Sequence, residues 1–440
     1  MDQTYSRATS VAILSIVRLL ERISYYGMRG MIILYAMDES GLSLGQSDAL
    51  FYYGTFTGLL YLSYGPLGLI SDFLLKQKNA TLIGLIAAVI GYVLLMVSNF
   101  YIVVFGLLMI VLGVGLTSPN MSVLLGQLFE KKDNKRDFAF VVYLIAINVG
   151  AFLAFIISGL IGERYGYEFG FGIAALCSLV ATVIFALTMR NMNLVEVNDG
   201  FTPKVYTDDH PEILDAGQDA SFIRSLPPPL PFQREGDASK FIKRHLLVFI
   251  IGGMATFFWQ LFEISTMQSY ADFDIVRSLT TLGISLDPSY GYGLQIIFFV
   301  PVALGFLALI YLRKRLSTIV FVSAGLLMIA AHMILIYFAK SINLPTFPVA
   351  LLGFVLLTFG ELCLSAIALS YVTRLANVKY ASTIVGLFMM MTFLGMKVIS
   401  LFNIDFENFN LLILSVVPIV FGLVLFFLRK VFLQLSGGLE

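Results

Sequence analysis

The chain has 440 residues, of which 58% are apolar and only 13% are charged, and its formal net charge is zero. Soluble globular domains carry about 25% charged residues, so this composition excludes a soluble domain and indicates an integral membrane protein in a lipid bilayer. A neutral chain gives no sign of a nucleic-acid partner. The two cysteines, Cys177 and Cys363, lie in apolar runs without metal-ligand spacing, so we expect no metal and no cofactor.

Apolar runs of about 20 residues, the length that crosses the hydrocarbon core, recur along the chain. Backbone polar groups cannot face lipid unpaired, which leaves helices or a closed barrel, and continuous rather than alternating runs favour helices. We therefore predict an all-α membrane protein with twelve transmembrane helices. Their ranges are 10–36, 48–71, 80–97, 101–128, 139–161, 169–189, 243–266, 288–312, 317–339, 347–373, 381–402 and 410–428.

A polar segment, 190–242, divides these helices six and six, and it holds four prolines between residues 227 and 231. Such a run favours a semi-rigid polyproline II spacer. We interpret it as a cytoplasmic linker between an N-terminal six-helix bundle, 1–189, and a C-terminal one, 243–430, with a tail at 431–440; a docking site for a partner is the alternative. Two six-helix bundles match the major facilitator fold, in which solute binds near the bilayer midplane and one half rocks against the other.

Lys and Arg residues gather in alternate loops, which predicts the orientation. With both termini inside, most of the loop Lys and Arg residues lie in short cytoplasmic segments, as the positive-inside rule requires. We therefore expect a multi-pass protein of the cytoplasmic (inner) membrane with both termini in the cytoplasm.

The first predicted helix carries charges within an apolar stretch. Arg18, Arg22, Tyr25 and Arg29 fall on one face because they step by three or four residues, and Glu21 lies at the edge of that face. Charges at membrane depth normally face a bundle interior or a water-filled cavity. The pattern therefore predicts a solute pathway.

Three further charges are predicted at membrane depth, Glu263, Glu361 and Lys397. A membrane acid can bind and release a proton as its surroundings change, which suits proton-coupled transport; an internal salt bridge between helices is the alternative. Asn148 is the main uncharged polar candidate, either for binding solute or for bonding a neighbouring helix. We find no catalytic motif with supporting context and expect no enzymatic activity.

Five segments resemble motifs of one family, the proton-dependent oligopeptide transporters of the major facilitator superfamily. In the first half, Glu21–Arg29 (ERISYYGMR) resembles the family motif ExxERFxYYGMR, Gly115–Asn120 (GLTSPN) resembles GLFKPN, and Ile147–Phe152 (INVGAF) resembles INxGAF. In the second half, Phe258–Glu263 (FWQLFE) resembles FWxxFEQ, and Gly360–Ser365 (GELCLS) resembles GELxLSP. Their order makes the match more specific than any single motif. The resemblance implies that di- and tripeptides bind in a central cavity and that inward proton flow drives them.

The resemblance also implies roles for single residues. Arg22 would bind the peptide carboxylate, Glu361 the peptide amino terminus and Asn148 the peptide backbone. The aromatic lining would be Tyr25, Tyr26 and Tyr61.

Further residues would couple and gate transport. Glu263 would be a proton-linked acid, with Glu21 as a second candidate. Arg29 would pair with an external acid such as Asp272 to close an outer gate.

Two departures from the family pattern change its charges. Arg18 replaces the first Glu of ExxER, and Ser118 replaces the Lys of GLFKPN. The family's four positions sum to zero, whereas Arg18, Glu21 and Arg22 leave one net positive charge here. Either Arg18 takes over part of the missing Lys charge, or the coupling machinery has been lost; Lys397 is a further charge without a family counterpart.

Two functions therefore stay open at this point. The first is a secondary transporter of small peptides or related solutes, in which Glu21, Glu263 or Glu361 are the candidates for proton coupling. The second is a transport-inactive relative that serves as a scaffold or accessory subunit of a membrane complex. The replaced acid and base motivate the second.

Overall fold

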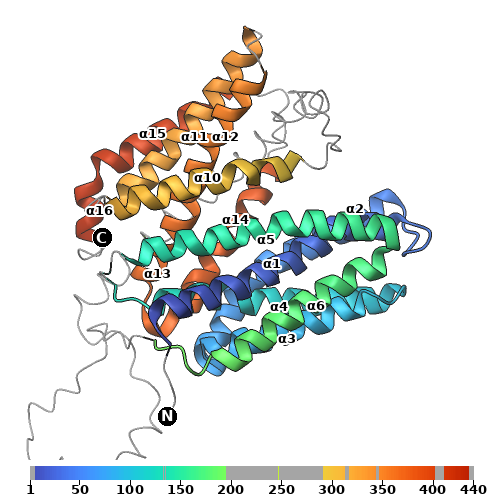
Figure 1. Cartoon of the computed structure of the whole chain (residues 1–440). Coiled ribbons are helices and arrows are strands. Elements are labelled where there is room, and N and C mark those ends of the chain that lie inside the picture. The colour runs from blue at the N-terminus through green and yellow to red at the C-terminus, as the bar shows by residue number, and fades with distance from the viewer. Residues whose placement is uncertain are drawn as a thin grey trace, which may run out of the picture.

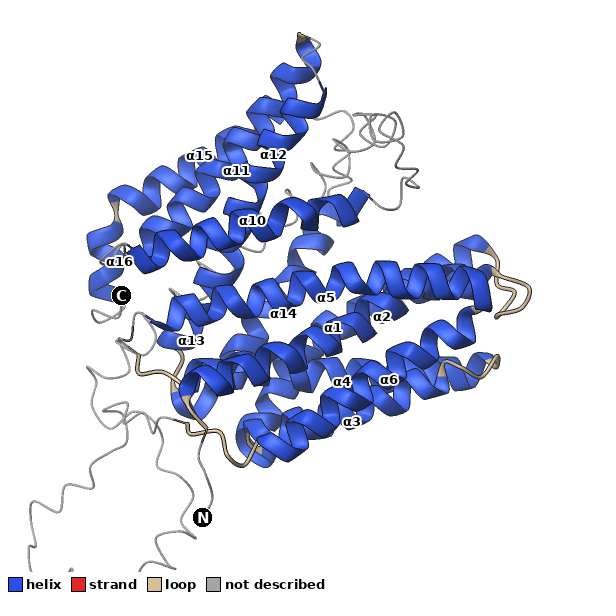
Figure 2. Ribbon diagram, viewed as in Figure 1, coloured by secondary structure: helices blue, strands red, loops and turns tan. Residues whose placement is uncertain are grey.

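The computed structural model describes residues 5–131, 133, 135–194, 246, 291–312, 317–342, 346–401 and 411–435. Every regular element in these ranges is a helix (Figures 1 and 2). Seven helical stretches in them are long and apolar enough to cross a membrane. This agrees with the predicted all-helical fold.

The first part of the chain forms six long helices, which we call the N-terminal helices. With one short π-helix, the elements are α1 (Arg7–Met37), α2 (Gln46–Ile70), η1 (π, Ser71–Leu75), α3 (Gln77–Leu94), α4 (Phe100–Gln127), α5 (Lys135–Tyr165) and α6 (Tyr167–Thr188).

The second part forms what we call the C-terminal helices. They are α10 (Gly291–Leu312), α11 (Thr318–Ser341), α12 (Thr346–Glu361), η3 (π, Leu362–Ile367), α13 (Ala368–Leu375), η4 (3₁₀, Val378–Tyr380), α14 (Ala381–Leu401), α15 (Leu411–Phe427) and α16 (Arg429–Leu435). In Figure 1, α10, α11, α12 and α15 form a group above the N-terminal helices, coloured yellow to red, whereas α14 packs against α2 and α4.

Every predicted span corresponds to a helix except 243–266, which lies outside the described residues apart from residue 246. The predicted helix 347–373 differs in one respect, because a π-helical stretch, Leu362–Ile367, interrupts it directly after Glu361. π-helical turns within α-helices are frequent at functional sites. The predicted linker 190–242 is outside the described residues beyond Leu194.

Small residues let the N-terminal helices approach closely. A Cβ added at Gly113 of α4 would lie 2.7 Å from the Gly84 carbonyl oxygen of α3, so only glycine fits this crossing, as in other membrane helix pairs. A Cβ added at Gly150 of α5 would lie 2.6 Å from the Leu19 carbonyl oxygen and 3.0 Å from Arg22 Cβ on α1. Gly150 therefore brings α5 against α1 at the level of the charged residues.

The two groups of helices meet through polar contacts at the end where α5 and α14 begin. We call these residues the clamp: Asp72, Asp137, Ser370, Arg374, Ser382 and Thr383. The Asp72 carboxylate accepts from the backbone N–H groups of Ser382 at 3.1 Å and Thr383 at 2.7 Å. Asp72 thus caps the first turn of α14.

A second part of the clamp joins α5 to α13. Asp137 accepts from Arg374 Nη2 at 2.9 Å and from the Ser370 hydroxyl at 2.6 Å. The neighbouring Arg136 donates to the Thr373 hydroxyl at 2.7 Å. Arg374 is only 3% exposed, so its charge needs compensation inside the protein, and Asp137 contributes to it.

Candidate functional site

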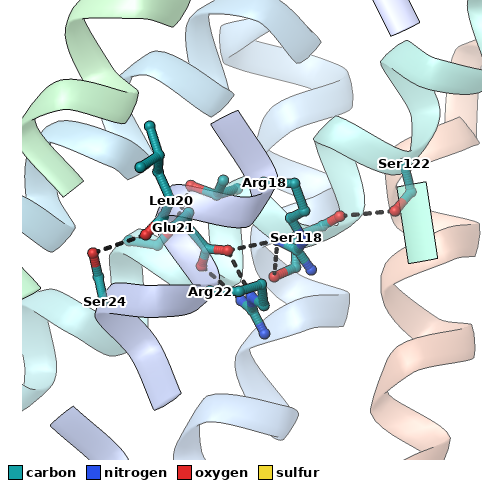
Figure 3. A network of polar contacts seen from close by, with 9 residues as sticks. Arg18, Leu20, Glu21, Arg22, Ser24, Ser118 and Ser122 are labelled. Carbon is teal, nitrogen blue, oxygen red and sulfur yellow. Dashed lines mark hydrogen bonds and ion pairs between the residues drawn. The ribbon is translucent and has the colours of Figure 1, made fainter. Parts of the chain in front are cut away.

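Glu21 on α1 lies between two arginines of the same helix (Figure 3). Arg22 holds both carboxylate oxygens in a fork, with Nε 2.6 Å from Oε2 and Nη2 2.6 Å from Oε1. Arg18 donates from Nη1 to the same Oε2 at 3.1 Å. A bidentate, charge-assisted pair of this kind is among the stronger hydrogen-bond arrangements in proteins. The pair fixes both partners in one orientation.

These three side chains are buried, at 5% exposure for Arg18, 1% for Glu21 and 6% for Arg22. One carboxylate faces two guanidinium groups, and no other acid lies in salt-bridge contact with them among the residues that the structure describes. An arginine stays charged in a protein. The cluster, Arg18–Glu21–Arg22, therefore keeps one net positive charge, which a bound anion would neutralise. We call this cluster the anion seat.

Arg18 also contacts two other helices. Its Nη1 donates to the Ser118 hydroxyl of α4 at 3.2 Å, and its guanidinium lies 5.7 Å from the centre of the Tyr143 ring on α5. Both contacts are geometries that stabilise a cation. Arg18 thus places its charge against α4, at the residue that replaces the family's lysine.

Tyrosines surround Arg22. Its guanidinium lies 4.7 Å from the centre of the Tyr25 ring and 5.6 Å from that of Tyr26. The third predicted aromatic, Tyr61 on α2, makes an edge contact with Tyr64 at 5.8 Å between ring centres. The structure therefore places two of the three predicted tyrosines directly at Arg22.

The anion seat retains unused hydrogen-bond donors. Arg18 Nη2 and Arg22 Nη1 donate to no other residue in the described part of the chain. Arg18 Nε is enclosed without a partner. A carboxylate placed beside the two guanidinium groups would meet donors of matching geometry.

A second buried acid lies on the C-terminal helices. Glu361, the last residue of α12, is 4% exposed, and its Oε1 accepts from Asn148 Nδ2 on α5 at 3.1 Å. Its other oxygen, Oε2, is enclosed without a partner, and no cation forms a salt bridge with it among the residues described. We call Glu361 with Asn148 the acid seat. A proton or an amine at Oε2 would relieve its cost of burial.

Helix α5 joins the two seats. Tyr143 contacts Arg18 and Asn148 contacts Glu361, while Gly150 lies against Arg22. At 1.5 Å of rise per residue, these contacts fall within about two turns of one helix. The anion seat and the acid seat therefore lie at similar depth, on helices from both halves of the chain.

Several predicted residues lack such a placement. Glu263 and Asp272 lie outside the described residues, and so does the side chain of Lys397 on α14. Arg29 donates from Nε to the Tyr53 hydroxyl of α2 at 2.6 Å. The outer gate and the roles of Glu21 and Glu263 in proton coupling stay predictions.

Sequence reasoning missed Tyr143 and the part that Gly150 plays. The motif INVGAF contains Gly150, so its packing role was detectable in principle, because a glycine within an apolar helix is often required by close packing. Tyr143 carries no such signal, since one tyrosine in an apolar run is ordinary.

The comparisons with known proteins agree with the resemblance noted above. The family model of the POT family matches residues 78–207. Two relatives align along nearly the whole chain. An uncharacterized transporter of Bacillus subtilis is 27% identical over 95% of this chain and 93% of its own length. A di-/tripeptide transporter of Lactococcus lactis subsp. cremoris is 25% identical over 96% and 95%.

A third relative matches a shorter stretch at higher identity. The peptide transporter YePEPT of Yersinia enterocolitica is 36% identical over 171 residues, which are 38% of this chain and 34% of that protein.

Solved structures share the fold. The crystal structure of a peptide transporter POT in complex with sulfate is 21% identical with a TM-score of 0.63, covering 97% of this chain and 95% of that one. A POT family transporter in complex with a thioalcohol-conjugated peptide is 19% identical with a TM-score of 0.64, covering 96% of both chains. Fold, motifs and relatives agree, and we conclude that this multi-pass membrane protein is similar to the POT family, whose model matches residues 78–207.

Proposed function

We propose that this protein is a secondary active transporter of small peptides or peptide-like solutes, which works by alternating access with protons as the coupled ion. The observation that carries the proposal is the pair of buried seats with opposite charge, the net positive Arg18–Glu21–Arg22 cluster on α1 and Glu361 on α12. A peptide presents a carboxylate at one end and an ammonium at the other. The two seats match these two ends.

Each seat suits one part of the solute. The carboxylate would bind the free donors of Arg22 and Arg18, beside the rings of Tyr25 and Tyr26. The ammonium would bind the unpartnered oxygen of Glu361. Asn148 bridges α5 to Glu361 and would then turn its amide toward the peptide backbone. Tyr61 completes the proposed lining.

The relatives support peptide as the solute, because one that aligns along nearly the whole chain is a di-/tripeptide transporter and one that aligns over 171 residues is a peptide transporter. The scaffold alternative has no comparable support. The relatives described above are named as transporters.

We further propose that both termini face the cytoplasm, in the cytoplasmic (inner) membrane. The clamp, which includes Asp72 and Asp137, then lies on the cytoplasmic side of the membrane. Under this orientation the structure corresponds to a conformation that is closed to the cytoplasm. Arg29 and Asp272 would close the opposite side, and Glu21 and Glu263 stay the proposed proton-linked acids.

Uptake of labelled dialanine into proteoliposomes tests the function. We expect accumulation when the outside is more acidic than the inside, and slower uptake without a proton gradient. Empty liposomes and liposomes that contain Arg22→Ala protein are the controls. No uptake above these controls under either condition, together with no binding of dialanine to the purified protein, would reject the proposal.

A further inference from the structure

The anion seat and the acid seat differ in how their charge can be neutralised. Arg18 and Arg22 cannot lose a proton in a protein, so the net positive charge of the anion seat persists at every physiological pH. Glu361 is a carboxyl group, which can become neutral by binding a proton. The anion seat thus requires a bound anion to neutralise its charge. At the acid seat, a proton on Glu361 can take the place of an amine.

Arg18 increases the need of the anion seat for a bound anion, compared with a site that has Arg22 alone. Without Arg18, the fork between Glu21 and Arg22 would be neutral. With Arg18, a buried charge of +1 remains, and an uncompensated buried charge is costly. The donors left over on both guanidinium groups define where the compensating oxygens would bind.

The position of Arg18 is set by its surroundings. Arg18 Nη1 donates hydrogen bonds to the Ser118 hydroxyl at 3.2 Å and to the Glu21 carboxylate at 3.1 Å. The centre of the Tyr143 ring lies 5.7 Å from the guanidinium carbon. These contacts come from α4, α1 and α5, so the guanidinium is held between three helices.

The acid seat is already partly satisfied without solute. Asn148 donates to one oxygen of Glu361 at 3.1 Å, which leaves only Oε2 enclosed and unpartnered. A proton on Oε2 would leave the group uncharged and the Asn148 hydrogen bond intact.

We propose that Arg18 is a specificity-determining residue: it makes the free carboxylate the essential part of the solute and the free amine dispensable. The chain therefore accepts N-acylated peptides and other amine-free carboxylates, and it rejects peptides whose carboxylate is blocked. This inference rests on the proposed function and names the solute class of the same site.

Competition for binding to the full-length purified protein tests the inference. The probes are dialanine, N-acetyl-dialanine and dialanine amide, with binding measured by calorimetry. We expect N-acetyl-dialanine to bind within about tenfold of dialanine, and dialanine amide to bind at least about 100-fold more weakly, because it leaves the charged donors without an acceptor.

Variants at position 18 separate charge from structure. Arg18→Gln should weaken binding of N-acetyl-dialanine by about 10- to 100-fold, and more than it weakens binding of dialanine. Arg18→Lys keeps the charge and should retain most of the affinity for N-acetyl-dialanine, which a purely structural role for the guanidinium would not allow. Thermal unfolding of each variant checks that it is folded.

The outcomes distinguish this inference from the proposed function. If dialanine binds but N-acetyl-dialanine is lost as completely as dialanine amide, the amine is essential and the inference is wrong while peptide binding stands. If Arg18→Gln weakens the binding of dialanine and N-acetyl-dialanine by the same factor, Arg18 does not set the specificity. If no probe binds to the folded protein, the proposed function and this inference fail together.

Discussion

Arg18 on α1 donates to the Ser118 hydroxyl on α4 across 3.2 Å. A cation from one helix thus lies beside the residue of another helix where the family pattern has a lysine. Of the two interpretations that the sequence left open, this contact favours the one in which Arg18 takes over part of the missing charge.

The contact predicts that the cation can be moved from α1 to α4. Ser118→Lys alone should destabilise the protein and abolish binding, because two like charges about 4 Å apart repel each other by on the order of 4 kcal/mol. Adding Arg18→Gln restores the net charge of +1 and should restore both thermal stability and dialanine affinity to within about tenfold. A double variant no better than Ser118→Lys would show that position 118 does not face the anion seat.

Glu361, which bonds Asn148 through one oxygen and has the other unpartnered, predicts that a change at the acid seat weakens binding only of solutes with a free amine. Glu361→Gln removes the charge but keeps the shape, so it should weaken binding of dialanine by about tenfold or more while leaving N-acetyl-dialanine nearly unchanged. Calorimetry with both ligands measures the two affinities. Equal losses for both ligands would count against an amine contact at Glu361.

Gly150 predicts a steric effect at the anion seat. An added methyl group would lie 2.6 Å from the Leu19 carbonyl oxygen, so Gly150→Ala should push α1 from α5 and destabilise the protein by about 1–3 kcal/mol. Gly54→Ala on α2 is the matched control, because no atom lies within 4 Å of its added Cβ. Thermal unfolding in detergent compares them. If Gly54→Ala destabilises the protein as much as Gly150→Ala does, close packing of α1 against α5 is not the cause of the destabilisation.

The clamp predicts a shift between conformations. Asp137→Asn would remove the carboxylate charge that faces the buried Arg374 across the two halves, so the clamp should open more often. Spin labels at the exposed Glu130 and Lys379, one on each half of the chain, should report longer and broader distances.

Asp133→Asn is the control for the clamp experiment. Asp133 pairs with Arg7, whose side chain is 51% exposed, and exposed pairs contribute little. Distances that Asp133→Asn lengthens as much as Asp137→Asn would indicate a general loss of charge, with no specific role for the clamp.

The fold was predictable from the sequence because lipid leaves few alternatives for long apolar runs. The helix boundaries follow from that constraint, and the predicted range 10–36 became Arg7–Met37. The π-helical stretch after Glu361 was not predictable, since it depends on how η3 packs against its neighbours.

The candidate site was predictable in its residue types and only partly in its geometry. Charges at membrane depth singled out Arg18, Glu21, Arg22 and Glu361. Their partners were not predictable, because the contact of Arg18 with Ser118 and that of Glu361 with Asn148 join helices far apart in the sequence. Helical periodicity says which residues share a face, but it does not say which faces meet.

The central claim is that Arg22, held in a fork by Glu21, binds the carboxylate of the solute. Binding of dialanine to the wild type, Arg22→Ala and Arg22→Lys, measured by calorimetry on folded protein, tests it most directly. The account predicts that Arg22→Ala lowers affinity at least about 100-fold, while Arg22→Lys retains part of it. Equal affinity of the wild type and Arg22→Ala would contradict the account.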